Sequence, residues 1–245
     1  MLSDWEYILK DKYNNEINNT NIKSFLKDLD LISKNYPRDY IIGYVDFLNC
    51  KIDLSKKPLI PRVETEHWVS NIIPIIKKHF NKEIQILDIF SGSGCIGIAL
   101  AKAIPNSIID FSDIEENNIK QIKINLKLNN IENYRKIVKS DIFSKIVHKY
   151  DVIVANPPYV PQSEALQAPL EPVKAIKAGK YGLDILEPFI AEIREYLNNN
   201  GIFVLEFHPN QVKKLKTILK EYGFNKFDFY KDQYNRYRYV IVYLQ

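Results

Sequence analysis

The chain has 245 residues, of which 46% are hydrophobic, and this suits one large domain or one domain with a small appendage. Its net charge of +4 is too small to argue for a nucleic-acid partner by itself, and two cysteines are too few for a disulfide framework or a metal cluster. No apolar run approaches the roughly 18 to 20 residues of a membrane span, and the start does not resemble a secretory or transit peptide.

The first part of the chain is predicted to stand apart from the rest. Residues 1–36 carry apolar side chains at helical spacing and predict a short helical N-terminal segment. Residues 37–61 alternate apolar and polar positions around turn candidates at Gly43 and at residues 55–58, which predicts a β-hairpin linker. Residues 62–245 are then expected to form the main domain.

A glycine loop follows the first predicted strand of the main domain. Thr65 is predicted to cap a helix over about residues 66–80, and residues 84–88 form a buried strand that ends at Asp88. The loop that follows leads into a helix and contains Phe90, Ser91, Gly92, Ser93 and Gly94. Its amides could hold a negative group of a cofactor, although such a loop also suits a dinucleotide or a simple tight turn. The P-loop lysine is absent after it.

Acidic side chains end the next two predicted strands. Residues 107–111 deliver Asp113, at the distance along the chain where an acid can accept both hydroxyls of a ribose; alone, it could equally be a helix cap. A helix is expected over residues 114–129. The strand over residues 134–138 leads to residues 140–143, which include Asp141. Backbone amides there, Ile142 and Phe143 could contact an adenine ring, although Phe143 could equally belong to the core.

The most informative stretch is an apolar strand that stops at two prolines. Residues 151–155 are rich in β-branched side chains, and Asn156, Pro157, Pro158 and Tyr159 follow at once. In an open α/β sheet this is the edge where ligands bind, and Asn156 offers both a carbonyl oxygen and an NH2 group. These residues predict a cradle for a planar amino group. The alternative is a turn that merely caps the strand.

The remaining elements complete a doubly wound sheet. After a proline-rich loop over residues 161–172 we expect a helix over residues 184–197 that stops at 198–201, a buried strand at 202–207 and a helix at 211–222. Two closing strands are predicted at 226–231 and 237–243, as a hairpin. Alternating strands and helices with this ending predict the α/β, Rossmann-like, seven-stranded fold of class I S-adenosylmethionine (SAM)-dependent methyltransferases.

Several separate motifs also carry a more specific likeness. They are Pro61, Arg62, Glu64, Thr65 and Glu66; residues 88–94; Asp113; residues 156–159; Glu171 and Pro172; residues 182–184; Leu205, Glu206 and Gln211; and Asp232 with Arg236. Over about residues 36–245 the chain resembles the HemK/PrmC family, the glutamine N5-methyltransferases of class 1 peptide chain release factors. It departs from the family pattern at Phe90, where the first loop glycine is expected, and in its short N-terminal segment.

The resemblance implies a reaction, a cofactor and a partner. The methyl group of SAM would pass to the side-chain nitrogen of the glutamine in the Gly-Gly-Gln motif of a release factor, without a metal. Asn156, Pro157, Pro158 and Tyr159 would be catalytic. The cofactor would be held by Asp88, residues 90–94, Asp113, Asp141, Ile142 and Asn156. We expect a monomer without direct nucleic-acid or membrane contact, in the cytoplasm or alternatively in the mitochondrial matrix.

Two other functions stay open on the sequence alone. A nucleic-acid amino (adenine N6-type) methyltransferase would use the same Asn-Pro-Pro-Tyr motif, but it would have to extrude a base and hold the strand on a basic surface. A binding module built on the cofactor fold is the third possibility. The presence of all the expected pocket residues together argues against it.

Overall fold

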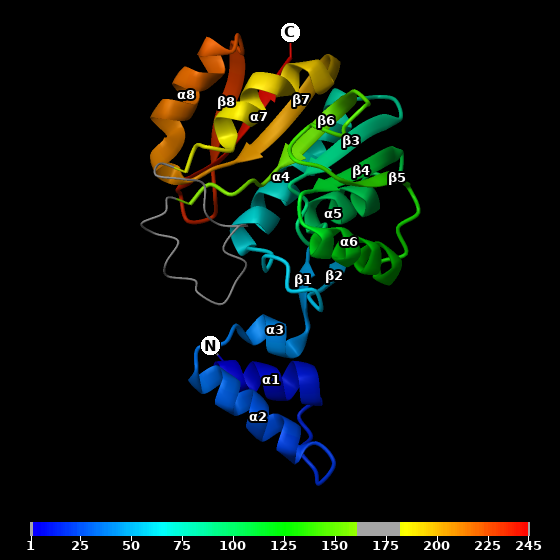
Figure 1. Cartoon of the computed structure of the whole chain (residues 1–245), viewed down its shortest axis with the longest axis vertical. Helices are drawn as coiled ribbons and strands as arrows, with labels where there is room; N and C mark the ends of the chain where they lie inside the picture. The colour runs from blue at the N-terminus through cyan, green and yellow to red at the C-terminus, as the bar shows by residue number, and fades with distance from the viewer. Residues whose placement is uncertain (1, 161–181, 245) are drawn as a thin grey trace.

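Three helices form the N-terminal part of the chain and project away from the rest of the molecule (Figure 1). The computed structural model describes residues 2–160 and 182–244. The three helices are α1 (Asp4–Tyr13), α2 (Ile22–Ser33) and α3 (Arg38–Ile42). The carboxylate of the buried Asp28 on α2 accepts hydrogen bonds from Lys12 Nζ and Tyr13 Oη of α1, each at 2.7 Å. This shared carboxylate holds the first two helices together.

The predicted hairpin is present, but its turn lies elsewhere. It consists of β1 (Tyr44–Phe47) and β2 (Cys50–Asp53), paired antiparallel, so the chain reverses at Leu48 and Asn49. The hairpin therefore reverses at neither predicted turn, although residues 55 and 56 do form a turn, in which the Lys57 N–H donates to the carbonyl oxygen of Leu54 at 2.8 Å. Gly43 instead ends α3 in the left-handed conformation, with φ of +94°, as glycine commonly does after a helix.

A seven-stranded sheet forms the centre of the main part and confirms the predicted fold class. Its order is β5-β4-β3-β6-β7-β9-β8; neighbours from β5 to β7 are parallel, and β9 is antiparallel to both β7 and β8. The strands are β3 (Ile84–Ile89), β4 (Ser107–Asp113), β5 (Tyr134–Lys139), β6 (Tyr150–Ala155), β7 (Leu197–Glu206), β8 (Lys226–Lys231) and β9 (Tyr237–Tyr243). Central β6 is buried along its whole length, as its apolar run predicts.

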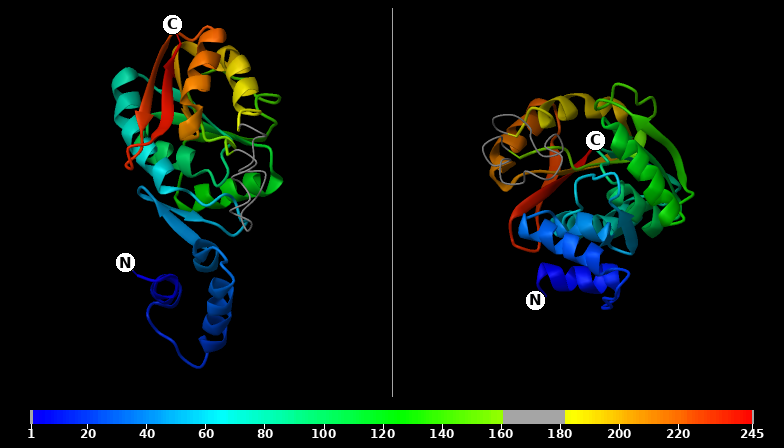
Figure 2. Two further views of the ribbon diagram at one scale, coloured as in Figure 1. Left: turned by 90° about the vertical axis from the view of Figure 1, so that its left-hand side faces the viewer. Right: turned by 60° about the horizontal axis from the view of Figure 1, so that its bottom comes forward.

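Helices cover both faces of this sheet (Figures 1 and 2). One face packs against α4 (Val63–His79), α5 (Cys95–Ala103) and α6 (Glu116–Leu128), and the other against α7 (Leu186–Glu192) and α8 (Val212–Glu221). Successive residues of a strand serve opposite faces: Val152 belongs to the first core and Ile153 to the second. No helix among the described residues is long and apolar enough to cross a bilayer.

Two further expectations about element boundaries are wrong. The helix that Thr65 was expected to cap begins at Val63 after Arg62, so Thr65 lies inside its first turn. Residues 198–201 do not stop a helix, because α7 ends at Glu192, a short 3-10 turn follows, and β7 already begins at Leu197. An irregularity in the pairing with β6 accommodates these extra residues. The predicted loop over residues 161–172 lies outside the described residues.

Polar side chains of α6 attach the hairpin to the main part. Asn125 accepts a hydrogen bond from the backbone N–H of Asp53 at 2.8 Å and donates to its carbonyl oxygen at 3.1 Å. The same Nδ2 atom donates to the carbonyl oxygen of Ser93 at 2.9 Å. Nearer the surface, Asn129 makes an equivalent pair of bonds with the backbone of Lys51. The hairpin is thus tied through α6 to the glycine loop.

Candidate active site

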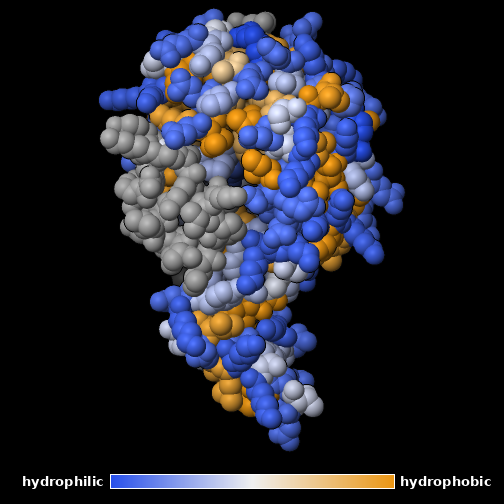
Figure 3. All heavy atoms as spheres, viewed as in Figure 1, coloured by the Kyte–Doolittle hydropathy of each residue, from blue (hydrophilic) through white to orange (hydrophobic). Residues whose placement is uncertain are grey.

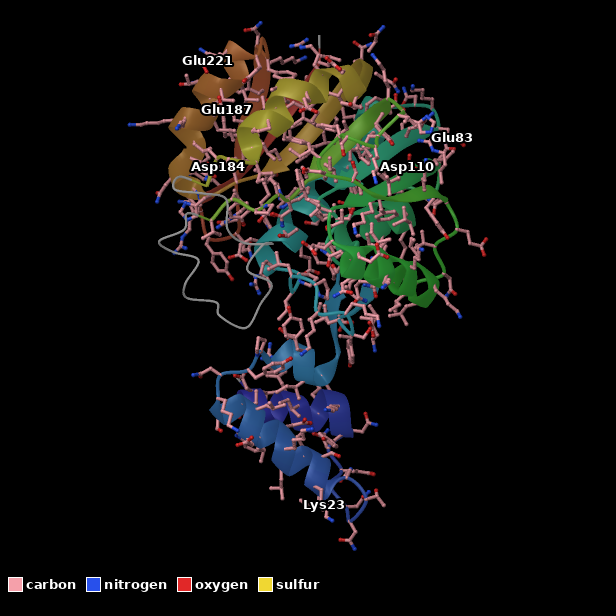
Figure 4. All side chains as sticks on the ribbon, in the orientation of Figure 1. Lys23, Glu83, Asp110, Asp184, Glu187 and Glu221 are labelled. Atoms are coloured by element: carbon pink, nitrogen blue, oxygen red, sulfur yellow. The ribbon has the colours of Figure 1, made fainter. Side chains whose placement is uncertain are left out.

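One cavity lies at the carboxyl edge of the parallel strands and contains most of the predicted site. Its volume is about 330 Å³. Of the predicted residues, its walls include Phe90, Ser91, Gly92, Ser93, Asp113, Asn156 and Pro158, together with residues 59–62 after the hairpin. A second cavity, lined by residues of α7 and α8 and by Asp184 and Glu187 (both labelled in Figure 4), contains none of them.

The glycine loop runs in the left-handed conformation at three positions. The φ angles are +60° at Phe90, +56° at Gly92 and +80° at Gly94. A Cβ atom added to Gly92 would meet no protein atom within 4 Å, so this backbone is open to a ligand in the cavity. Phe90 occupies a position that favours glycine, and its ring lies 5.8 Å from that of Phe189 on α7. The loop therefore fits the close approach of a cofactor.

Asp113 lies at the end of β4, and its carboxyl group accepts a hydrogen bond from the backbone of the glycine loop. Its Oδ2 accepts the N–H of Gly92 at 2.8 Å, and its Oδ1 accepts from Glu115 N at 2.9 Å and Asn118 Nδ2 at 3.0 Å. Burial raises the pKa of this carboxyl, whereas the bonds from Glu115, Gly92 and Asn118 lower it. A carboxylate oxygen can accept more than one bond, so Asp113 can hold the loop and still receive a hydroxyl from the cavity.

Four predicted cofactor residues do not line the cavity. Asp88 is fully buried beneath the loop, where its Oδ2 accepts the N–H of Gly97 at 2.8 Å and its Oδ1 has no partner among the described residues. Burial raises the pKa of Asp88 to about 8. Asp141 is exposed, and Ile142 packs against the core on the α7 face. Gly94, the N-cap of α5, is also not among the residues that line the cavity.

The residues after β6 divide between the cavity and the interior. Asn156 and Pro158 lie on the wall, whereas Pro157 is buried. Tyr159, which the resemblance implies to be catalytic, does not line the cavity, and its hydroxyl turns inward and donates to Glu206 Oε1 at 2.7 Å. Asn156 Nδ2 lies 3.3 Å from the hydroxyl oxygen of Thr65. The structure thus links Asn156 and Tyr159 to groups from other elements.

A buried acid that the site prediction omitted connects these groups. Glu206, at the end of β7, is 1% exposed and accepts hydrogen bonds from Thr65 Oγ1 at 2.8 Å and Trp68 Nε1 at 2.6 Å as well as from Tyr159. Arg238 on β9 lies close enough to lower the pKa of the Glu206 carboxyl. The available signal was a charged residue inside an otherwise apolar strand, which is uncommon unless it has partners.

The described residues contain no group of three or more His, Cys, Asp or Glu side chains that could hold a metal ion. The cavity instead presents the glycine loop, the carboxyl groups of Asp113 and Glu115, and the amide side chains of Asn117, Asn118 and Asn156. These groups fit a ligand that has a polar end, hydroxyls and a nearby amino group to be bound.

Comparison with known proteins places the chain in a family. Residues 71–240 match the family model described as the Methyltransferase small domain. The release factor glutamine methyltransferase of Borreliella burgdorferi is 33% identical over 225 residues, which cover 90% of this chain and 77% of that relative. The enzyme of the same name from Thermodesulfovibrio yellowstonii is 37% identical over 205 residues, covering 81% of this chain and 73% of the relative. The chain belongs to the release factor glutamine methyltransferase family.

Solved structures support the fold of this family member. A methyltransferase from Pyrococcus furiosus aligns with a TM-score of 0.59 at 18% identity, covering 89% of this chain and 98% of that protein. At this identity the likeness concerns the fold alone. It agrees with the class I methyltransferase architecture expected from the order of the elements. The sequence relatives confirm the family membership that the resemblance to HemK/PrmC proteins predicts.

Proposed function

We propose that this protein transfers the methyl group of SAM to the side-chain nitrogen (N5) of the glutamine in the Gly-Gly-Gln motif of class 1 peptide chain release factors. The observation that carries the proposal is the shared cavity: Asn156, the open backbone of Gly92 and the Asp113 carboxylate face one space in a member of this family. The names of the relatives supply the substrate class. They do not favour the nucleic-acid alternative.

The loop at Gly92 and the carboxylate of Asp113 would hold the cofactor by its methionine end and its ribose. SAM supplies a methyl group that its sulfonium already activates, so the reaction calls for no metal. We propose that the protein works as a monomer, without contact to nucleic acid or membrane, in the cytoplasm or, alternatively, in the mitochondrial matrix.

The chain's own contribution is to orient a weak nucleophile. An amide nitrogen attacks poorly because its lone pair is delocalised into the carbonyl group. The side-chain carbonyl of Asn156 and the backbone carbonyl of Pro157 would accept the two N–H groups of the substrate amide, which fixes the nitrogen and stabilises positive charge as it develops. Tyr159, bound to Glu206, would hold the Asn-Pro-Pro-Tyr turn in place.

The decisive experiment is mass spectrometry of a purified release factor after incubation with the protein and methyl-labelled SAM. We expect one methyl group on the glutamine of the Gly-Gly-Gln motif. A release factor in which that glutamine is replaced by glutamate serves as a control that should remain unlabelled, and the Asn156→Ala protein serves as a control that should label the release factor far more slowly. For Asn156→Ala we expect a loss of about 100- to 1000-fold in kcat. Label in nucleic acid and none in the release factor would overturn the proposal.

A further inference from the structure

The donor and the acceptor of each hydrogen bond around Glu206 can be assigned from the chemistry of the side chains. An ionised carboxylate only accepts, and the indole N–H of Trp68 only donates. Thr65 has one hydroxyl hydrogen, and its Oγ1 lies 2.8 Å from Glu206 Oε2, so that hydrogen is committed to the carboxylate. The oxygen of Thr65 is then left with acceptor capacity only. Whatever group faces it next must be a donor.

That next group is the side-chain amide of Asn156. Its two ends, NH2 and carbonyl oxygen, have nearly the same shape, and the surrounding hydrogen bonds decide which end faces which way. Because Thr65 Oγ1 can only accept, the NH2 end lies against it, at 3.3 Å. The carbonyl oxygen is thereby turned away from Thr65. Both residues lie on the wall of the cavity.

We infer that Glu206 is a positioning residue, which acts through Thr65 to fix the orientation of the Asn156 amide and so leaves its carbonyl oxygen to accept an N–H of the substrate. The inference rests on the proposed function for the identity of that substrate. It assigns a role to three segments distant in sequence: the first turn of α4, the turn after β6 and the end of β7.

The hydrogen bonds that link Glu206 through Thr65 to Asn156, here called the relay, depend on the ionisation of Glu206. Burial raises the pKa of Glu206, while donors from Trp68, Tyr159 and Thr65 and the charge of Arg238 lower it. Among the described residues, the titratable or charged groups that interact with it are Arg238 on β9, Tyr159 after β6 and Cys95 on α5. The pKa values of Tyr159 and Cys95 are raised, so both are neutral near neutral pH. A protonated Glu206 could donate a hydrogen bond to Thr65. The Thr65 hydroxyl could then donate to Asn156, which would reverse the orientation of the Asn156 amide. Activity should therefore fall as pH falls through the raised pKa of Glu206.

The first test separates the Thr65 hydroxyl from its shape. Thr65→Val keeps the volume and removes the hydroxyl, Thr65→Ser keeps the hydroxyl, and Thr217→Val removes an exposed threonine hydroxyl on α8 as a control. We expect Thr65→Val to lower kcat roughly 10- to 100-fold with the KM for SAM within about twofold, and Thr65→Ser to restore most of kcat. Equal kcat in Thr65→Val and wild type would overturn the inference.

A second test needs neither substrate nor activity, so it stands even if the proposed function fails. In the ¹⁵N-labelled wild-type protein the NH2 signals of Asn156, assigned by their loss in Asn156→Ala, should shift as Glu206 titrates. In Glu206→Gln, which cannot ionise, that pH-dependent shift should vanish. Asn156 signals that ignore pH in the wild type, or that shift in the same way in Glu206→Gln, would contradict the relay.

Discussion

Phe90 is the non-glycine residue among the three left-handed positions of the glycine loop. Its backbone adopts φ of +60°, where a side chain costs roughly 1–2 kcal/mol relative to glycine. The contact of its ring with Phe189 offsets part of that cost. An aromatic side chain thus occupies the wall of the cavity, next to the place proposed for the methionine end of the cofactor.

Comparison of Phe90→Gly with Phe90→Ala isolates the effect of the backbone conformation on the free energy of unfolding, because both variants lose the ring. We expect Phe90→Gly to be more stable than Phe90→Ala by about 1 kcal/mol in the free energy of unfolding, since only glycine adopts this φ without a steric penalty. Urea denaturation of the two variants at one pH measures the difference. An alanine variant as stable as the glycine variant would show that position 90 is not left-handed in solution.

Asp113 makes a prediction about binding. Asp113→Ala removes the carboxylate from the cavity and also releases the N–H of Gly92, so both the ribose site and the loop are affected. We expect at least a tenfold loss of SAM affinity, equivalent to about 1.4 kcal/mol, by isothermal calorimetry. Asp228→Ala, an exposed aspartate on β8, is the control and should bind normally. Unchanged affinity in Asp113→Ala would remove Asp113 from the site.

At the scale of elements, the attachment of the hairpin to α6 is the feature most open to test. Asn125 and Asn129 make the same kind of contact with β2, but Asn125 is fully buried and also holds Ser93. Asn125→Ala leaves backbone groups of Asp53 and Ser93 unpaired in the interior and should cost about 2–3 kcal/mol. Asn129→Ala should cost less than about 1 kcal/mol. Equal effects in urea denaturation would argue against a buried clamp.

Sequence patterns predicted the elements that depend on local signals. The central strands and the closing pair β8 and β9 were recognisable from their apolar runs and flanking turns. Helix α3 was missed because it has five residues, too few for a periodic pattern, and Gly43 was assigned to a hairpin turn although it ends this helix. Residues 198–201 were misassigned because Asn and Gly also occur in strand irregularities.

The site was predictable only in part, because sequence patterns indicate only those site residues that follow from local signals. The glycine loop, Asp113 and Asn156 each follow a strand, so their positions at one edge of the sheet could be inferred. Glu206 and Thr65 are 141 positions apart in the sequence, and no local pattern indicates that their side chains meet. Asp88 resembles a ligand-binding acid in sequence, but it ends a strand whose last residues are covered by α5.

For the whole molecule, Asp88 should make stability depend on pH. Burial raises its pKa in the folded protein from an ordinary value near 3.8 to about 8. Between these values the folded state retains a proton that the unfolded state has lost, so stability is greatest below the lower value and decreases as pH rises. One such group contributes at most about 1.4 kcal/mol per pH unit.

Asp88→Asn removes that titration and keeps an oxygen to accept the N–H of Gly97. We expect the free energy of unfolding of this variant to fall less between pH 4 and pH 8 than that of the wild type. Denaturation at several pH values measures both curves. Parallel curves would mean that Asp88 is already ionised in the folded protein near neutral pH.

In Figure 3 apolar groups are visible among hydrophilic ones, both on the main part and on the N-terminal helices. Leu2, Trp5 and Leu26 there are 44%, 47% and 56% exposed. Trp5 lies on α1 and Leu26 on α2, and none of the three side chains is on the wall of the cavity.

The position of β9 between β7 and β8 bears on how the protein is made. A growing chain emerges from the ribosome in order, yet the strand that borders β7 is synthesised after β8. Until residues 237–243 have emerged, the edge of β7 stays unpaired and available for wrong pairing, and Glu206 lacks the neighbouring charge of Arg238. A nascent chain can therefore build its parallel strands early, but the charge of Arg238 reaches Glu206 only when the last strand inserts.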